Sequence, residues 1–116
     1  YSNAGHWPAL IYRASSGEVE SLPNIDVPLG VLTVIEYGEW SALLASGDRL
    51  ILYTDGITES RRGIEFFGLE GLESVVRRDG RENGSDLLRR IVDASTEWGE
   101  GILKDDAALV LLSRLE

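Results

Sequence analysis

The segment Asp48–Glu59 constrains this chain more than any other, because an apolar strand pattern runs directly into Thr-Asp-Gly. The strand would carry Asp55 at its tip, and a carboxylate on a rigid element is well placed to hold a hard divalent cation. Gly56 would be free to adopt backbone angles that other residues avoid. An isolated Asp-Gly pair is also a common hairpin turn signal, so the sequence alone leaves both interpretations open.

A pair of carboxylates, Asp105 and Asp106, stands just before the last apolar segment of the chain. Two strand ends on one sheet can bring their carboxylates together at a metal ion. The alternative is that Asp-Asp in a Gly-rich loop serves only as turn chemistry after a helix. Taken together with Asp55, the pair makes a metal site worth testing.

Apolar alternation and turn residues predict the strands of the fold. Ile51 and Tyr53 would face away from Leu50 and Leu52, and all four are apolar, so this strand is expected to be buried on both faces. The expected strands are 9–14, 19–22, a hairpin of 37–45 with 49–54, and 107–114.

Two helices are predicted between the last two strands. Leu69, Leu72 and the Val75-Val76 pair share one helical face, and Asp79-Gly80 ends that element. Ser85 is the expected N-cap of the second helix, whose apolar stripe runs to Trp98. Strands, two helices and a final strand indicate an α+β domain in which helices cover a sheet.

Composition excludes several classes of function. The 116 residues contain no Cys, which removes disulfides, thiolate zinc sites and a cysteine nucleophile. The net charge of -9 repels phosphate backbones, so we expect no nucleic-acid partner. The longest apolar run, 107–112, is far shorter than the roughly 18 residues of a membrane span. No signal peptide is visible, so a cytoplasmic location is expected, and the absence of Met suggests a piece of a longer polypeptide.

Five segments, in order and across nearly the whole chain, carry a resemblance to a known family. They are Asn3-Ala4-Gly5-His6-Trp7-Pro8, Pro28-Leu29-Gly30, Gly47-Asp48-Arg49 through Tyr53-Thr54-Asp55-Gly56-Ile57-Thr58-Glu59, Glu65-Phe66-Phe67-Gly68, and Asp105-Asp106-Ala107-Ala108-Leu109-Val110. The chain resembles the C-terminal part of a PPM (type 2C) metal-dependent protein serine/threonine phosphatase. It is most similar to the bacterial SpoIIE-like branch, which acts on regulators of sigma factors.

The resemblance implies a fold and a set of site residues. Residues 1–116 would form the C-terminal portion of a single PPM-type domain, an αββα sandwich of two mainly antiparallel sheets flanked by helices. Carried over by position, Asp55 and Asp105 would be metal ligands for Mn²⁺ or Mg²⁺, two ions in the complete domain, and Asp106 a neighbour. No catalytic residue is certain, and His6 is a candidate near the metal site, with a structural histidine as the alternative.

The implied function is metal-dependent hydrolysis of phosphoserine or phosphothreonine on a regulatory protein such as an anti-anti-sigma factor. The family's bridging aspartate has no counterpart in this chain, so these residues alone are expected to be inactive and to form dimers or swapped assemblies. Two alternatives remain: a non-catalytic phosphatase-like module that binds a regulatory protein, and an unrelated β-sandwich binding domain.

Overall fold

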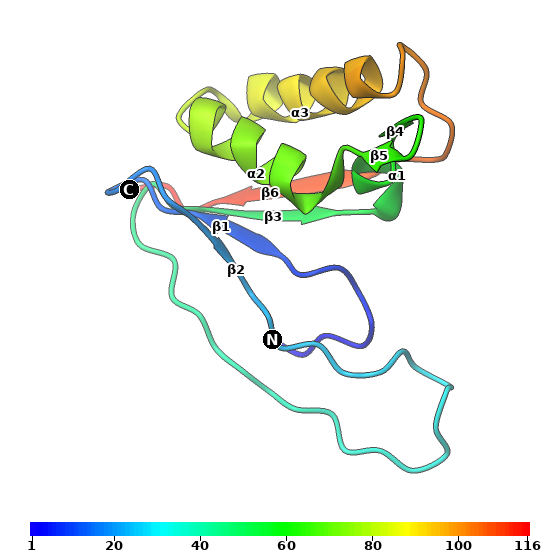
Figure 1. Ribbon diagram of the computed structural model, residues 1–116. Helices are drawn as coiled ribbons and strands as arrows, with labels where there is room; N and C mark the ends of the chain where they lie inside the picture. The colour runs from blue at the N-terminus through cyan, green and yellow to red at the C-terminus, as the bar shows by residue number, and fades with distance from the viewer.

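A computed structural model describes residues 1–116 and shows one antiparallel sheet with two helices lying across one of its faces (Figure 1). The elements in chain order are β1 Leu10–Tyr12, β2 Val19–Ser21, β3 Arg49–Tyr53, α1 Asp55–Thr58, β4 Arg61–Arg62, β5 Glu65–Phe66, α2 Gly68–Asp79, α3 Gly84–Trp98 and β6 Leu109–Ser113.

The main sheet has the order β2-β1-β3-β6, and every neighbouring pair is antiparallel. Ile51 of β3 lies opposite Leu10 of β1 on one side and Leu111 of β6 on the other, which places β3 at the centre. The strands expected at 9–14, 19–22, 49–54 and 107–114 are confirmed with shorter bounds. No helix of the chain is long and apolar enough to cross a bilayer.

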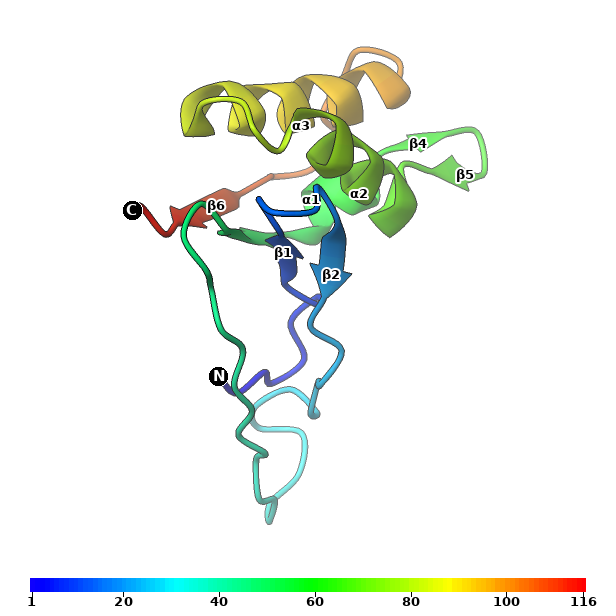
Figure 2. The same ribbon diagram turned by 90° about the vertical axis from the view of Figure 1, so that its left-hand side faces the viewer.

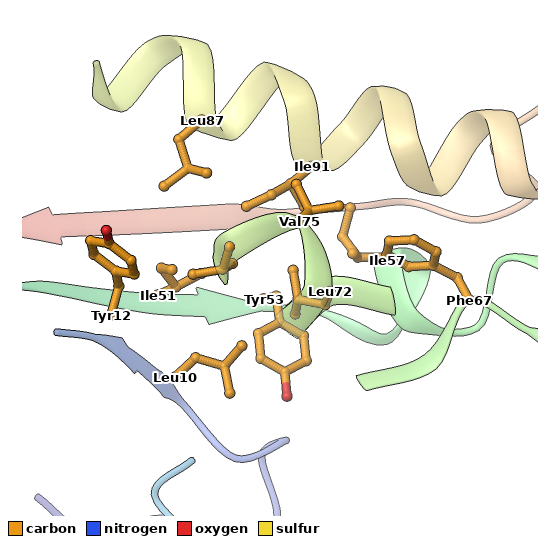
Figure 3. Close-up of a cluster of buried hydrophobic side chains, with 11 residues drawn as sticks. Leu10, Tyr12, Ile51, Tyr53, Ile57, Phe67, Leu72, Val75, Leu87 and Ile91 are labelled. Atoms are coloured by element: carbon orange, nitrogen blue, oxygen red, sulfur yellow. The ribbon is translucent and has the colours of Figure 1, made fainter. Parts of the chain in front are cut away.

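The core lies between the sheet and the helices (Figure 3). Its 11 buried side chains come from the sheet, from the three helices and from the N-cap residue of α2: Leu10, Tyr12, Ile51, Tyr53, Ile57, Phe67, Leu72, Val75, Val76, Leu87 and Ile91. Burial of such side chains contributes roughly 1.5–3 kcal/mol each, so this layer supplies most of the driving force for folding. The helical spacing of the apolar residues and the α+β class are therefore confirmed.

The expectation that β3 is buried on both faces is wrong for this chain. Ile51 and Tyr53 point to the helices and are almost fully buried, but Leu52 on the opposite face is 37% exposed. Val110 and Leu112 of the neighbouring β6 are 57% and 56% exposed on the same side. The physical reason is that no second layer of these 116 residues covers that side. We call the surface formed by Leu52, Val110 and Leu112 the bare face.

The predicted strand at 37–45 is also wrong. This segment belongs to the long connection between β2 and β3 that extends away from the helices (Figure 1), and β3 pairs with β1 and β6 instead. Side chains rather than a strand ladder hold its end, since Arg13 Nη1 donates to the carbonyl oxygen of Leu43 at 2.6 Å. Residues 37–45 alternate in part between apolar and polar side chains but do not pair with any strand of the sheet. An alternating pattern does not by itself specify which strand a segment pairs with.

Helix α3 begins with a different cap from the one expected. Asn83, not Ser85, is the N-cap, and its side-chain oxygen accepts a hydrogen bond from the backbone N–H of Asp86 at 3.2 Å. Ser85 lies inside the first turn. Asn and Ser are nearly equivalent as caps, so the sequence offered two positions and the structure uses the earlier one.

Asp48 lies between the segments 37–45 and 49–54 that were expected to form a hairpin, and it is buried. The residue is 1% exposed, and its side chain accepts hydrogen bonds from Arg13 Nη1 at 2.7 Å and from the backbone N–H groups of Ala14 and Ala45 at 3.0 and 2.9 Å. The Arg13 hydrogen bond holds the pKa of this carboxyl below its usual range, helped by the two backbone donors. Asp48 thus ties the end of β1 to the start of β3.

A short hairpin, β4–β5, stands beside α1 and was not predicted (Figure 2). Its register pairs Arg61 with Phe66 and Arg62 with Glu65, and Gly63 in its turn has a φ of 61°. The hairpin is fastened to α3 by Trp98, whose Nε1 donates to the carbonyl oxygen of Glu65 at 3.1 Å. Glycine at the first position of a two-residue loop was the available sequence signal.

Candidate functional site

The end of β3 and the start of β6 are joined at Thr54. Its backbone N–H donates to the carbonyl oxygen of Ala108 at 3.1 Å, and its Oγ1 accepts from the N–H of Ala108 at 2.9 Å. Asp55, the next residue, is the first residue of α1 and is exposed. The hairpin-turn interpretation of Asp-Gly is therefore wrong, because the chain passes from β3 into a helical turn. The carboxylate stands at a strand end, as the sequence predicts.

Gly56 allows the loop that carries Asp105 and Asp106 to pass close to α1. A Cβ atom at Gly56 would lie 2.0 Å from the carbonyl oxygen of Asp106 and 3.2 Å from the Cα of Ala107. The glycine is needed for this close approach and not for unusual backbone angles, since its φ is not positive. The loop that carries Asp105 and Asp106 thus passes directly against the residue that follows Asp55.

Asp105 lies in an exposed part of that loop. Its Oδ1 accepts a hydrogen bond from the backbone N–H of Asp106 at 2.8 Å, which fixes the turn before β6. The turn interpretation of Asp-Asp is therefore correct as a local description. It leaves Asp105 Oδ2 free of any hydrogen bond within the chain. A turn residue at this place can also serve as a ligand.

His6 lies in a loop that is attached to the same strand. Its ring packs against that of Tyr53 with centroids 6.5 Å apart, and its Nδ1 lies 2.7 Å from the carbonyl oxygen of Trp7. The hydroxyl of Tyr53 donates to the carbonyl oxygen of Pro8 at 2.8 Å. Because Tyr53 stands two residues before Asp55, these contacts hold His6 at the end of the sheet where Asp55 lies.

Tyr53 is a positioning residue that sequence reasoning did not single out. Burial, with a smaller contribution from the charge of Glu73, raises its pKa to about 12. The phenol therefore stays protonated at neutral pH and keeps donating to Pro8. Its signal in the sequence was only that of one more apolar strand residue, so its hydrogen bond was invisible there.

The residues present fit a hard divalent cation in type but not in number. Asp55 and Asp105 offer carboxylate oxygens, the ligands that Mg²⁺ and Mn²⁺ prefer. No group of three or more His, Cys, Asp or Glu side chains in the chain converges to hold an ion. Mg²⁺ in proteins is often held by one or two carboxylates plus water and phosphate oxygens. The chain thus offers at most part of a coordination sphere.

A small hollow of about 200 Å³ opens one helical turn from Asp55. Its lining residues come from the His6 loop, α1, β5 and the start of α2: Trp7, Thr58, Glu59, Phe66, Gly68 and Leu69. Thr58 is 3% exposed, and its Oγ1 forms no hydrogen bond within the chain. A larger hollow of about 340 Å³ shares Trp7 with the small one, is also lined by His6, and reaches Leu50 and Leu52 of β3.

Comparison with known sequences decides the family. The family described as Stage II sporulation protein E (SpoIIE) matches residues 1–115. The chain belongs to the SpoIIE family. Phosphoserine phosphatase RsbU of Bacillus subtilis is 25% identical over 114 residues, which is 98% of this chain and 34% of RsbU. This SpoIIE-family chain therefore spans about a third of the length of that relative.

Solved structures confirm the fold of this SpoIIE-family chain. The SiaA-PP2C domain of Pseudomonas aeruginosa matches 94% of the chain and 43% of its own length, with a TM-score of 0.73 and 18% identity. The PP2C phosphatase domain of SpoIIE from Bacillus subtilis, solved with a fragment of its regulatory domain, matches 95% of the chain and 32% of its own length. Its TM-score is 0.71 and its identity 21%. The expected PP2C-type fold, with an antiparallel sheet flanked by helices, is confirmed.

Proposed function

We propose that this chain is part of a metal-dependent protein phosphatase that hydrolyses phosphoserine or phosphothreonine on a regulatory protein. The observation that carries the proposal is the close approach of two segments that carry carboxylates: Gly56, which follows Asp55 on α1, packs against the backbone of Asp106. The fold on which they stand is that of PP2C phosphatase domains. RsbU, a relative over nearly the whole chain, is a phosphoserine phosphatase.

In this proposal each residue of the site has a defined task. Asp55 and Asp105 provide ligands to Mn²⁺ or Mg²⁺, and Asp106 shapes the loop. Divalent ions bound there supply charge neutralisation for the phosphate ester and activation of water. Tyr53 keeps the His6 loop against the same end of the sheet through its hydrogen bond to Pro8. Residues 1–116 contain no Cys and therefore supply no thiolate nucleophile, and direct attack by water is the proposed route.

The partner is inferred from the family. A phosphorylated regulatory protein, such as an anti-anti-sigma factor in the cytoplasm, is the proposed substrate. The ligand set within residues 1–116 is incomplete, so turnover requires further ligands from outside these residues. The chain alone is therefore proposed to bind divalent metal weakly and to be inactive.

One alternative follows from the same incomplete ligand set. If the remaining ligands are missing from the full-length protein, the domain binds a regulatory protein without hydrolysing it. Hydrolysis of a phosphoserine peptide by the full-length protein in Mn²⁺, with and without EDTA, separates the two. We expect turnover that EDTA abolishes and that excess Mn²⁺ restores. Absence of turnover at any Mn²⁺ or Mg²⁺ concentration would favour the binding module.

A further inference from the structure

We propose that the small hollow beside α1 receives an apolar side chain of the phosphoprotein substrate, located within a few residues of the phosphorylated residue. We call this site the Phe66 hollow, lined by Trp7, Thr58, Glu59, Phe66, Gly68 and Leu69. The inference rests on the proposed phosphatase function. It adds a specificity site to a reaction that otherwise recognises only a phosphate ester.

The Phe66 hollow lies close to Asp55 along the chain. Thr58 of the hollow follows Asp55 by three residues on α1, and a helix rises about 1.5 Å per residue. An extended peptide advances roughly 3.3 Å per residue. A substrate whose phosphate lies near Asp55 therefore brings residues one to three positions away within reach of the hollow.

The lining of the Phe66 hollow suits an apolar side chain better than a phosphate. Trp7, Phe66 and Leu69 provide apolar surface, and the lining contains no Lys, Arg or His. The carboxylate of Glu59 at the hollow disfavours a phosphate there. An apolar side chain is the occupant that matches such a surface, because it loses no hydrogen bonds on entering.

A positively charged side chain, that of Arg61, lies next to the hollow. Arg61 lies directly opposite Phe66 in the hairpin, and paired residues project from the same face of a two-stranded ribbon. The chain carries a net charge of -9, so an exposed arginine at this place is a local exception to a repulsive field. It complements the negative charge of a phosphoprotein that docks beside it.

Phe66 and Trp7 are exposed aromatic walls of the hollow, and the hairpin that carries Phe66 is held in place by contacts with α3. Phe66 is 54% exposed and Trp7 42%. On the other face of the hairpin the guanidinium of Arg62 lies 4.5 Å from the ring centroid of Trp98, and Trp98 Nε1 donates to Glu65. These contacts fix the ribbon that carries Phe66, so an incoming side chain meets a preformed wall and pays little ordering entropy.

The test uses the full-length protein and a panel of phosphoserine peptides. Each peptide is alanine-rich and carries a single leucine at one of the three positions on either side of phosphoserine, and the all-alanine peptide is the parent. We expect leucine at one or more positions to raise kcat/KM about tenfold over the parent. Phe66→Ala and Phe66→Gln should bring that ratio close to one. Ile64→Ala is the matched control, because Ile64 is 93% exposed at the hairpin tip and does not line the hollow.

The outcomes separate this inference from the proposed function. If the wild-type protein hydrolyses the parent peptide but shows no leucine preference at any position, the Phe66 hollow is not a substrate site while the phosphatase function stands. Equal losses of preference in the Phe66 variants and in Ile64→Ala would also overturn it. If the wild type shows no leucine preference and the Phe66 variants melt at a much lower temperature, the protein's own chain fills the hollow and the inference is overturned. No hydrolysis of parent peptide or p-nitrophenyl phosphate in Mn²⁺ would remove the proposed function and this inference with it.

Discussion

Gly56 and Asp106 approach so closely that a Cβ atom at position 56 would lie 2.0 Å from the Asp106 carbonyl oxygen. Gly56→Ala should therefore push the loop that carries Asp105 away from α1. We expect an overpacking cost of about 2 kcal/mol in the free energy of unfolding, measured by chemical denaturation. The Mn²⁺ concentration for half-maximal activity of the full-length protein should rise at least tenfold.

Gly84→Ala is the control for that substitution. A Cβ there would meet only the end of the Leu111 side chain, at 3.1 Å, and alanine is the better residue in a helix. Its unfolding free energy should stay within about 1 kcal/mol of the wild type. If Gly56→Ala changes the unfolding free energy as little as Gly84→Ala and leaves the Mn²⁺ requirement unchanged, the close approach of Gly56 to Asp106 does not matter for metal-dependent activity.

Asp48→Ala should be among the most destabilising substitutions of a charged residue. It leaves the backbone N–H groups of Ala14 and Ala45 without their acceptor and the Arg13 guanidinium without its buried partner. The expected cost is about 3 kcal/mol in urea unfolding at pH 7. Glu20→Ala removes a half-exposed partner of the same arginine and should cost less than about 1 kcal/mol.

The pH dependence of stability should also contain a contribution from Asp48. Its pKa is lower in the folded state than in the unfolded chain, mainly because of Arg13, so its ionised form stabilises the fold above the ordinary aspartate pKa of about 4. This contribution is lost as the pH falls through the lower, folded value. Unfolding free energies measured between pH 7 and pH 2 should therefore fall less steeply in Asp48→Asn. Parallel curves for the two proteins would exclude the contribution.

Two buried hydroxyls should respond in opposite ways to removal. Thr58 Oγ1 has no hydrogen-bond partner within the chain, whereas Ser95 Oγ donates to the carbonyl oxygen of Ile57 at 2.7 Å. Thr58→Val should raise the unfolding free energy by about 1 kcal/mol, because it removes an unpaired polar group. Ser95→Ala should lower it by about 1–2 kcal/mol. Thermal melting of both variants provides the check, and a destabilised Thr58→Val would mean that its hydroxyl has a partner outside these residues.

The bare face predicts association of the isolated 116-residue chain. Leu52, Val110 and Leu112 present a contiguous apolar surface on paired strands. Light scattering after size exclusion should show dimers or larger species, and Val110→Glu should shift them toward monomer. In the full-length protein the same substitution should instead lower the melting temperature if further chain covers this face. A monomeric wild-type fragment would contradict the expectation.

Local patterns were sufficient for the elements whose apolar residues face one core. The spacing of Leu72 and Val76, and of Leu87 and Ile91, predicts α2 and α3 because each helix buries a single stripe. The strand at 37–45 fails because strand pairing is a non-local choice: β3 is satisfied by β1 and β6, and alternation does not reveal a partner. The exposure of Leu52 likewise depends on which layers are present, which its own sequence does not encode.

The carboxylates of the candidate site could be predicted from the sequence, but the tertiary contacts that position them could not. Asp55 and Asp105 stand out because each interrupts an apolar pattern at a strand end. The contact of Gly56 with Asp106 and the hydrogen bond of Tyr53 to Pro8 join residues about fifty and forty-five positions apart. Such tertiary contacts leave no local signature, so Gly56 was predicted for its backbone freedom and is used for its small size.

The most direct test of the account compares three aspartate substitutions in the full-length protein. Asp55→Asn and Asp105→Asn should each reduce Mn²⁺-dependent hydrolysis of a phosphoserine peptide by at least a hundredfold, because each removes a negative ligand, while melting temperatures change by only a few degrees. Asp106→Asn is the matched control from the same loop and should stay within about fivefold of the wild type, since that side chain is a neighbour and not a ligand. Equal activity of all three variants and the wild type, at limiting Mn²⁺, would contradict the assignment of Asp55 and Asp105 to a metal centre.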